Sequence, residues 1–258
     1  MNAAWAWAGA RAVGTSHQTQ ALPCQDAFAC SILRRAEHQP VLIAALADGA
    51  GSAELAEVGA TLATSLVVDT AQEALTEVGG RSSLADILRY AVSETRTVIQ
   101  LKAEHDGRAI NDYATTLLVA VLSPTEGAIG QIGDGAVVID DGGEWRPVHW
   151  PDHGEYANST SFLTQTDALD LLRIATFEQP VRRIALFSDG LERLLLDFRT
   201  RVAHGPFFDS IFGRLPPGSE AGHLAEVSAE LAALLSSDKV NSRTNDDKSL
   251  LCATLVDS

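Results

Sequence analysis

Basic residues are scarce in this chain. It carries 19 Lys and Arg against 34 Asp and Glu, which leaves a formal net charge of −15 over 258 residues. A field of that sign repels DNA, RNA and anionic lipid surfaces, so we expect no nucleic acid and no membrane among its partners. An anionic substrate would need positive charge supplied locally, at the place where it binds.

Cysteine and long hydrophobic runs are also rare. Cys24, Cys30 and Cys252 are odd in number and lack the spacing of a CxxC pair or a zinc site, which favours a reducing compartment. The apolar N-terminus reaches Gly14 before the roughly 20 residues of a membrane span, and it has no basic signal-peptide segment. We therefore interpret residues 5–13 as a strand and expect a cytoplasmic protein.

Apolar patterning predicts one domain over residues 1–258, built from blocks of strands and helices. Three- and four-residue spacings of apolar side chains predict helices at 52–75, 84–104 and 223–235, with a further helical region after Gly190. Clustered rather than alternating elements indicate an α+β fold. Short apolar runs bounded by turn residues predict strands at 5–13, 27–34, 41–47, 114–122, 127–133, 136–140, 183–187 and 249–257.

Residues 142–182 are rich in Trp, Pro, His, Gly and Asn and show little periodicity. We predict an irregular, flap-like segment across the surface. Within it, Glu155 and Asn158 either shape a flap beside a functional site or belong to an ordered loop with Asx-type hydrogen bonds.

The dipeptide Asp-Gly occurs five times, and three of its aspartates stand out. Asp and Gly are leading turn formers, and a plain turn suits Asp106 and Asp141, which lie in polar surroundings. Asp48, Asp134 and Asp189 instead each end an apolar run, in LIAALAD, AIGQIGD and RIALFSD. Burying an unpaired carboxylate there is costly or raises its pKa, so three such strand ends indicate a shared partner.

Further carboxylates adjoin other predicted strands. Asp246 and Asp247 precede the last strand, and Asp26 precedes the strand at 27–34. If these strands are neighbours, four or five carboxylates share a small volume and need cations. The ligands are all oxygens, with no adjacent His or Cys, which favours Mg²⁺ or Mn²⁺ over zinc. A pair of ions bridged by Asp48 would activate a water and hold a phosphate, and glycine at Gly49 lets the backbone carbonyl approach.

Six short motifs follow one another in a recognisable order: CQDAF, ALADGAGS, YATTLLVAV, QIGDGAVV, ALFSDGLE and NDDKSLL. This succession, from about residue 9 to 257, resembles the metal-dependent serine/threonine protein phosphatases of type 2C. GTSH, PCQDA and GEYANSTSFL resemble a compact bacterial branch of that family. The resemblance implies a four-layer α-β-β-α sandwich of two mainly antiparallel β-sheets flanked by helix pairs, with a metal centre at one end.

The resemblance also implies the chemistry. Two or three Mn²⁺ or Mg²⁺ ions would support hydrolysis of phosphoserine and phosphothreonine by a water that bridges two ions. The substrate would be a phosphorylated protein, and a cognate serine/threonine kinase would be a partner.

The resemblance also assigns roles to individual site residues, one motif at a time. Asp48 resembles the ligand that bridges both catalytic ions, and Gly49 resembles the carbonyl ligand of the second ion. Asp189 and Asp246 would complete the coordination of the first ion. Asp247 stands where the family usually has Asn, and it is the alternative ligand to Asp246. Asp134 resembles the acid that holds a third, weaker ion together with Asp189.

The remaining roles include departures from the family pattern. Asp26 resembles the acid that orients metal-bound water. Gln25 stands where the family more often has Glu, and a neutral amide there would weaken binding of the second ion. Ala50 stands where some members have a His that is proposed as general acid. His17 lies in the region where many members have a phosphate-gripping Arg. It would bind phosphate as a hydrogen-bond donor, or it is only a turn residue.

Three other functions are alternatives to this phosphatase activity. A catalytically weak or inactive module that binds or senses phosphorylated partners is favoured by Gln25, Ala50 and the missing Arg. The retained repelling carboxylates argue against it. A two-metal nuclease conflicts with the net charge. A cysteine phosphatase would need an Arg-containing loop after its Cys, and the sequence after Cys24 has none.

Thr115 and Thr116 lie in a predicted strand, and we interpret them as β-branched residues of the core.

Overall fold

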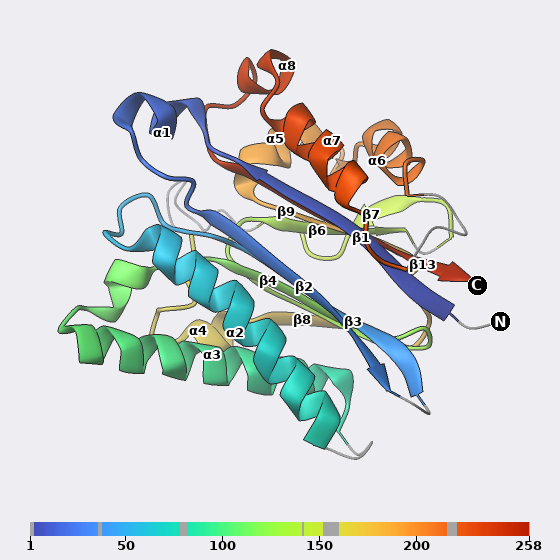
Figure 1. Cartoon of the computed structure of the whole chain (residues 1–258), viewed down its shortest axis with the longest axis horizontal. Helices are drawn as coiled ribbons and strands as arrows, with labels where there is room; N and C mark the ends of the chain where they lie inside the picture. The colour runs from blue at the N-terminus through green and yellow to red at the C-terminus, as the bar shows by residue number, and fades with distance from the viewer. Residues whose placement is uncertain are drawn as a thin grey trace.

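Two β-sheets face one another in the computed structural model, which describes residues 3–35, 38–77, 82–140, 142–151, 160–215 and 221–257 (Figure 1). Their strand orders are β12-β1-β13-β9-β6-β7 and β2-β3-β4-β5-β8, and every neighbouring pair is antiparallel except β1 and β12. The six-stranded sheet contains β12 (Gly222–His223), β1 (Ala3–Ala12), β13 (Lys248–Asp257), β9 (Arg183–Phe187), β6 (Ala136–Asp140) and β7 (Trp145–Pro147). The five-stranded sheet contains β2 (Asp26–Arg35), β3 (His38–Asp48), β4 (Leu117–Leu122), β5 (Gly127–Ile132) and β8 (Arg173–Phe177).

Strand β3 shows why the central strands read as unbroken apolar runs. Successive side chains of a strand point to opposite faces of the sheet. Ile43 and Ala45 belong to the cluster packed under the helices, whereas Leu42 and Leu46 belong to the cluster between the two sheets. Because both faces are buried, both sets of side chains are apolar.

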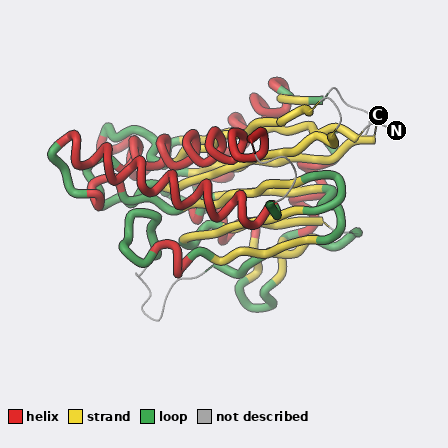
Figure 2. Tube along the Cα trace, turned by 90° about the horizontal axis from the view of Figure 1, so that it is seen from below, coloured by secondary structure: helices red, strands yellow, loops and turns green. Residues whose placement is uncertain are grey.

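Helices α2 (Ala56–Glu77) and α3 (Leu84–Asp106) cover the outer face of the five-stranded sheet and lie side by side across it (Figure 2). The prediction that the first helix begins near residue 52 is wrong, because residues 52–55 form turns before Ala56. The side chains on its buried face are also smaller than expected. Val58 is 38% exposed, while Ala60 and Ala63 are fully buried. Small side chains let this helix lie close to the sheet.

The outer face of the six-stranded sheet carries a second layer of shorter helices (Figure 1). Together the helices and sheets form the expected four-layer sandwich. This layer contains α5 (Glu192–Leu195), the small β10 (Leu196–Asp197) and β11 (Val202–Ala203) ribbon, α6 (Gly205–Phe212), α7 (Ala225–Leu235) and α8 (Asp238–Asn241). No helix in the described ranges is both long and apolar enough to cross a membrane.

The segment 142–182 is more ordered than its composition suggests. It contains β7, α4 (Ala168–Leu171) and β8, which pairs with β5 at the edge of the five-stranded sheet. The expectation of an irregular segment is wrong for these parts. Edge strand β8 is only half-buried along its length, so its sequence lacks a clear apolar alternation. Glu155 and Asn158 lie outside the described residues.

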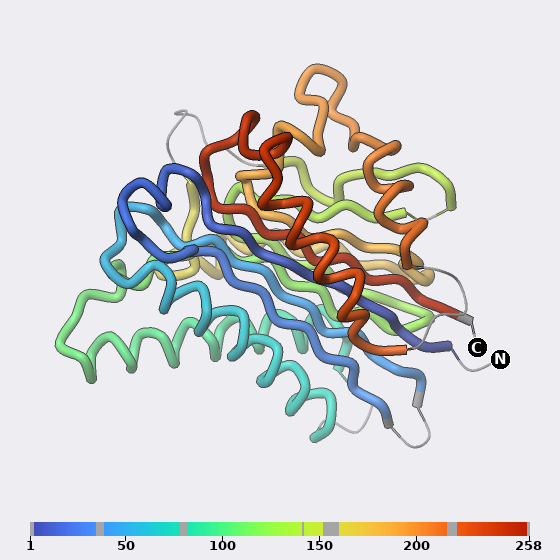
Figure 3. Tube along the Cα trace, turned by 45° about the horizontal axis from the view of Figure 1, so that its top comes forward, coloured from blue at the N-terminus to red at the C-terminus, as the bar shows by residue number. Residues whose placement is uncertain are grey.

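Strand register places all the predicted acidic motifs at one end of the sandwich. Ala3 pairs with Asp257 near the chain termini, and Ala12 pairs with Lys248 at the opposite end. Helix α1 (Thr15–Gln20) lies at this second end, beside the segment that leads into β13 (Figure 3). Strand β3 ends there and strand β2 begins there.

Candidate functional site

Asp26 and Asp48 form a directly opposed pair in the β2–β3 ladder. Asp48 is the last residue of β3, and Asp26 is the first residue of β2. Both therefore project toward the other sheet, as Leu46 does two positions earlier. Like charges placed opposite one another destabilise a sheet, so this pair marks a site rather than a structural contact.

The predicted carboxylates meet around one cavity. Asp189 begins the 3₁₀ turn η2 (Asp189–Leu191) one residue after the end of β9, Asp134 lies in the β5–β6 turn, and Asp246 precedes β13. The cavity has a volume of about 190 Å³. Its lining consists of His17, Gln25, Asp48, Gly49, Ala50, Gly51, Thr116, Asp134, Thr160, Phe162, Asp189, Asp246 and Asp247. Asp26 is fully buried behind this lining.

Asp26 is held by two serine hydroxyls from the opposite sheet. Its Oδ2 accepts hydrogen bonds from Ser188 Oγ at 2.7 Å and Ser249 Oγ at 2.8 Å. Burial raises the pKa of Asp26 to about 7, and repulsion from Asp247 and Asp189 adds to the effect. The two serine hydrogen bonds lower the pKa but do not offset the burial. Sequence reasoning missed both serines, because a hydroxyl beside an acidic motif has no distinctive spacing.

The other central carboxylates carry the same signature. Burial raises the pKa of Asp48 well above its ordinary value, with repulsion from Asp26 and Asp189. Burial likewise raises the pKa of Asp189 to about 6, although a hydrogen bond with Asp48 opposes the shift. Raised pKa values at clustered acids indicate a site that is built to hold positive charge.

Glu192 is a further buried acid of the cluster that sequence reasoning missed. It is 8% exposed, and burial raises its pKa to about 8 with repulsion from Asp189 and Asp134. It lies inside the motif ALFSDGLE, but a glutamate at the start of a helix is ordinarily a solvated residue. Asp134 accepts a hydrogen bond from Thr160 Oγ1 at 2.5 Å, which was also not foreseen.

Asp247 is engaged with its neighbours, whereas Asp246 is exposed. Asp247 Oδ1 accepts from the Gly14 amide at 2.6 Å, and Oδ2 accepts from the Gln25 amide at 2.5 Å. Oδ2 also contacts His17 Nδ1 at 2.9 Å. Three donors leave this carboxylate, which is 2% exposed, little capacity for an ion. Asp246 is therefore the better candidate ligand of the two.

His17 lies in α1 and lines the cavity beside Asp247. A carboxylate only accepts hydrogen bonds, so the contact requires that His17 Nδ1 carries a proton. The imidazole is thereby held in one orientation, with Nε2 on the opposite edge of the ring.

Thr115 and Thr116 are buried as expected, but they also hold the end of β3. The Asp48 amide donates to Thr116 Oγ1 at 2.9 Å, and Thr115 Oγ1 donates to the Asp48 carbonyl at 2.9 Å. Their burial agrees with the interpretation as core packing, and the two hydroxyl contacts add a hydrogen-bonding role to it. A threonine hydroxyl that bonds to a neighbouring strand cannot be distinguished in the sequence from one that only packs.

Glycine after an acid allows close backbone approach at this end of the sandwich. A Cβ at Gly190 would lie 2.0 Å from the carbonyl oxygen of Asp247, which no side chain tolerates. The segments that carry Asp189 and Asp246 therefore touch through backbone atoms. By contrast, Gly107 has a φ of +66° and ends α3, so Asp106-Gly107 is the plain turn that was expected. Asp141 of the other turn lies outside the described residues.

The residues of the cavity fit a hard divalent cation. Among the described side chains, Asp26 Oδ1, Asp189 Oδ1 and Gln25 Oε1 are buried oxygens without a hydrogen-bond partner. All other candidate ligands are also oxygens, which Mg²⁺ and Mn²⁺ prefer. Within the described residues no three His, Cys, Asp or Glu side chains form a ready metal cage, so the acids surround the cavity without closing on one point.

The cysteines have a different character. Cys24, Cys30 and Cys252 are all free thiols. Burial raises the pKa of Cys24 to about 12, with repulsion from Asp26 and Asp247, so its thiol stays protonated at neutral pH. A cysteine nucleophile is therefore disfavoured by the structure as well.

Comparisons with known proteins agree with this geometry. The family model described as protein phosphatase 2C matches residues 13–236. Serine/threonine-protein phosphatase 3 of Escherichia coli (strain K12) is 37% identical over 250 residues, which cover 96% of this chain and 98% of that protein.

Solved structures share the fold at low sequence identity. The catalytic domain of the serine/threonine protein phosphatase PstP, in complex with two manganese ions, has a TM-score of 0.62 at 19% identity and covers 99% of this chain and 100% of its own. Serine/threonine phosphatase Stp1 from Staphylococcus aureus has a TM-score of 0.61 at 14% identity and covers 98% and 95%.

Proposed function

This chain belongs to the protein phosphatase 2C family, and we propose that its acidic cavity is the site where phosphoserine and phosphothreonine of a protein substrate are hydrolysed. The activity is that of a metal-dependent serine/threonine protein phosphatase. The observation that carries the assignment to this cavity is the convergence of Asp48, Asp189 and Asp246 from three separate strand ends.

The cation ligands are proposed from the lining of the cavity. Asp48, the Gly49 carbonyl, Asp189 and Asp246 would hold two Mn²⁺ or Mg²⁺ ions, and Asp134 with Asp189 would hold a third. When bound, such ions supply Lewis acidity to the phosphoryl oxygens and a more acidic water for in-line attack. Buried Gln25 Oε1 faces this region as a neutral ligand in place of the commoner carboxylate.

The protein's own groups orient the reactants. Asp26 is fixed by Ser188 and Ser249 through Oδ2, which leaves Oδ1 to accept a hydrogen bond from the attacking water. His17, oriented by Asp247, would donate from Nε2 to the substrate phosphate in place of an arginine. Because Ala50 offers no acidic proton, the leaving oxygen would take its proton from water or from His17.

We propose the reducing cytoplasm as the cellular context. Three free thiols are compatible with a reducing cytoplasm, and the net charge of −15 disfavours nucleic acid and anionic membranes as partners. A phosphoprotein phosphatase requires a kinase that produces its substrate, so we propose a cognate serine/threonine kinase as a functional partner.

The test compares three Asp→Asn variants at Asp-Gly sites. Asp48→Asn and Asp189→Asn should each lower the hydrolysis of p-nitrophenyl phosphate in Mn²⁺ by at least about 100-fold, since they remove ligands of the attacking centre. Asp106→Asn, at the last residue of α3, should keep its activity. Full activity in either of the first two variants, with a normal circular dichroism spectrum, would refute the assigned centre.

A further inference from the structure

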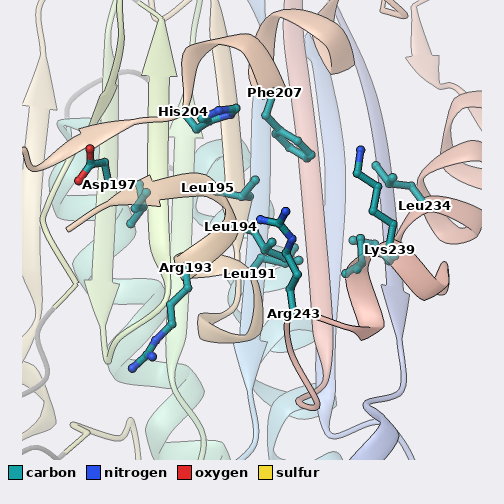
Figure 4. Close-up of a pocket in the computed structure, with 13 residues that line it drawn as sticks. Leu191, Arg193, Leu194, Leu195, Asp197, His204, Phe207, Leu234, Lys239 and Arg243 are labelled. Atoms are coloured by element: carbon teal, nitrogen blue, oxygen red, sulfur yellow. The ribbon is translucent and has the colours of Figure 1, made fainter. Parts of the chain in front are cut away.

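A second, larger cavity lies in the helical layer over the six-stranded sheet (Figure 4). Its volume is about 500 Å³, within the roughly 300–1,000 Å³ typical of small-molecule sites. Its walls are mainly apolar, because leucines of α5 and α7 line it together with Phe207 of α6. A neighbouring cavity of about 460 Å³ shares Phe207, Leu234, His204 and Lys239 with it, so the hollow continues past Phe207.

The rim of this cavity is basic although the whole chain is strongly acidic. Arg193, Lys239, Arg243 and His204 all line it and are exposed. Among the described residues the side chains of Lys239 and Arg243 make no ion pair or hydrogen bond, whereas Arg108 and Arg183, for example, each contact an acid. Arg193 interacts electrostatically with its neighbour Glu192. In Figure 4, Arg243 extends toward Leu194, and Lys239 lies beside Phe207.

The single acid in the lining does not neutralise these cations. Asp197 Oδ1 accepts hydrogen bonds from the amides of Arg199 at 2.8 Å and Thr200 at 3.2 Å, within its own turn. In Figure 4 it lies away from Lys239 and Arg243. The cavity thus combines an apolar wall with unpaired positive charge, which complements an anion with an apolar body.

Both walls of the cavity run directly into the candidate active site. Leu191 is two residues after Asp189, and Arg243 is three residues before Asp246. The two segments touch where Gly190 packs on the Asp247 carbonyl. An occupant that contacts both walls would therefore restrain the relative positions of Asp189 and Asp246.

We propose that this cavity binds a small amphiphilic anion, with its acyl or aryl body on the leucines and its carboxylate, sulfonate or phosphate on Arg243 and Lys239. Binding itself is independent of the proposed function. Its consequence rests on that function: an occupant that holds the two walls together stabilises the arrangement of Asp189 and Asp246, and so tightens Mn²⁺ binding. By linkage, Mn²⁺ tightens binding of the anion by the same factor.

Titration calorimetry with dodecanoate tests the binding. Saturable binding is expected, with at least about tenfold weaker affinity in Arg243→Glu and in Lys239→Glu. Arg89→Glu makes the same change in net charge at an exposed residue of α3, and it should change the affinity less than about twofold. Dodecanol, which has the chain without the charge, should bind at least about tenfold more weakly than dodecanoate.

Several results would overturn the proposal. These are the absence of saturable dodecanoate binding, equal binding of dodecanol, or equal losses in Arg243→Glu and Arg89→Glu. Arg243→Glu and Lys239→Glu are both tested, so that the result does not depend on the folding of a single variant. Circular dichroism shows whether each variant is folded.

The consequence for metal is measured separately, as Mn²⁺ affinity with and without dodecanoate. An unchanged affinity overturns the coupling. The dodecanoate titration without metal gives the same answer whether or not Asp48→Asn and Asp189→Asn abolish hydrolysis, so failure of the active-site assignment is distinguishable from failure of this site.

Discussion

Asp26 and Asp48 are direct cross-strand partners, and both have pKa values raised chiefly by burial. The fold therefore brings together buried acids whose ionisation costs free energy unless positive charge lies nearby. Asp189, from the other sheet, adds to the same repulsion. This arrangement predicts how the protein responds to protons and to metal.

The stability of the metal-free protein should fall as pH rises from about 4 to about 7. The folded-state pKa of Asp26 is about 7, against an ordinary value of 3.8, so in this window the folded form binds a proton that the unfolded form has released. The unfolding free energy decreases across the window and levels off above it, by an amount on the order of a few kcal/mol. Guanidinium unfolding in EDTA at about pH 5 and about pH 8 measures the difference.

Asp26→Asn provides the control for this prediction. It removes one of the titrating groups, so the variant should lose part of the pH dependence while Asp48 and Asp189 supply the rest. Adding Mn²⁺ should raise the unfolding temperature more at the higher pH, because the carboxylates must be deprotonated to bind it. A metal-free protein that is equally stable at both pH values would contradict this account.

Asp246 and Asp247 should separate into a metal ligand and a structural acceptor. Asp246→Asn removes an exposed carboxylate, so we expect at least about tenfold weaker Mn²⁺ binding with little change in stability. In Asp247→Asn only one side-chain oxygen remains to accept hydrogen bonds, whereas Gly14, Gln25 and His17 supply three donors. It should destabilise the fold by about 1–3 kcal/mol.

Calorimetric Mn²⁺ titration and urea unfolding of both variants test this division. The reverse pattern, in which Asp247→Asn loses metal affinity and Asp246→Asn loses stability, would assign the ligand role to Asp247. An Asn at position 247 is also a fair imitation of the commoner family residue, so the variant should still fold.

The position of the acids was readable from the sequence because a strand that is apolar on both faces has no reason to end on Asp. This logic located Asp48, Asp134 and Asp189, and the motif order supplied the fold. The partners of these acids were not readable. Ser188 and Ser249 reach the Asp26 carboxylate only from the opposite sheet, and Thr116 accepts from the Asp48 amide across a strand pair. Nothing in their local sequence distinguishes these hydroxyls from those of packing residues.

Packing against a sheet was a second limit of the sequence. On α2 the apolar periodicity pointed to Val58, yet the buried face consists mostly of alanine and glycine. Hydrophobicity alone ranks a valine above an alanine, whereas close helix-to-sheet contact favours the smaller side chain. Strand β8 was missed for a related reason, since a half-buried edge strand has no strong pattern.

His17 should affect substrate binding more than turnover. If His17 Nε2 contacts the phosphate, His17→Ala raises the KM for p-nitrophenyl phosphate by about tenfold with a smaller change in kcat. His17→Arg supplies the donor that many family members have, and it should recover much of the lost affinity. Steady-state kinetics in saturating Mn²⁺ make the comparison, and an unchanged KM in His17→Ala would leave His17 only its structural contact with Asp247.

Gly190 should be intolerant of even a methyl group. In Gly190→Ala the new Cβ would meet the Asp247 carbonyl oxygen at 2.0 Å, a backbone atom that can move only if the start of β13 moves with it. We expect a loss of about 1–3 kcal/mol in unfolding free energy. We also expect weaker Mn²⁺ binding, since the displaced segments carry Asp189 and Asp246. Gly51→Ala is the matched control for stability, because its Cβ would meet only Gln25 Oε1 at 3.9 Å. Urea unfolding of the two variants side by side measures the difference, and equal stabilities would show that the two segments separate without cost.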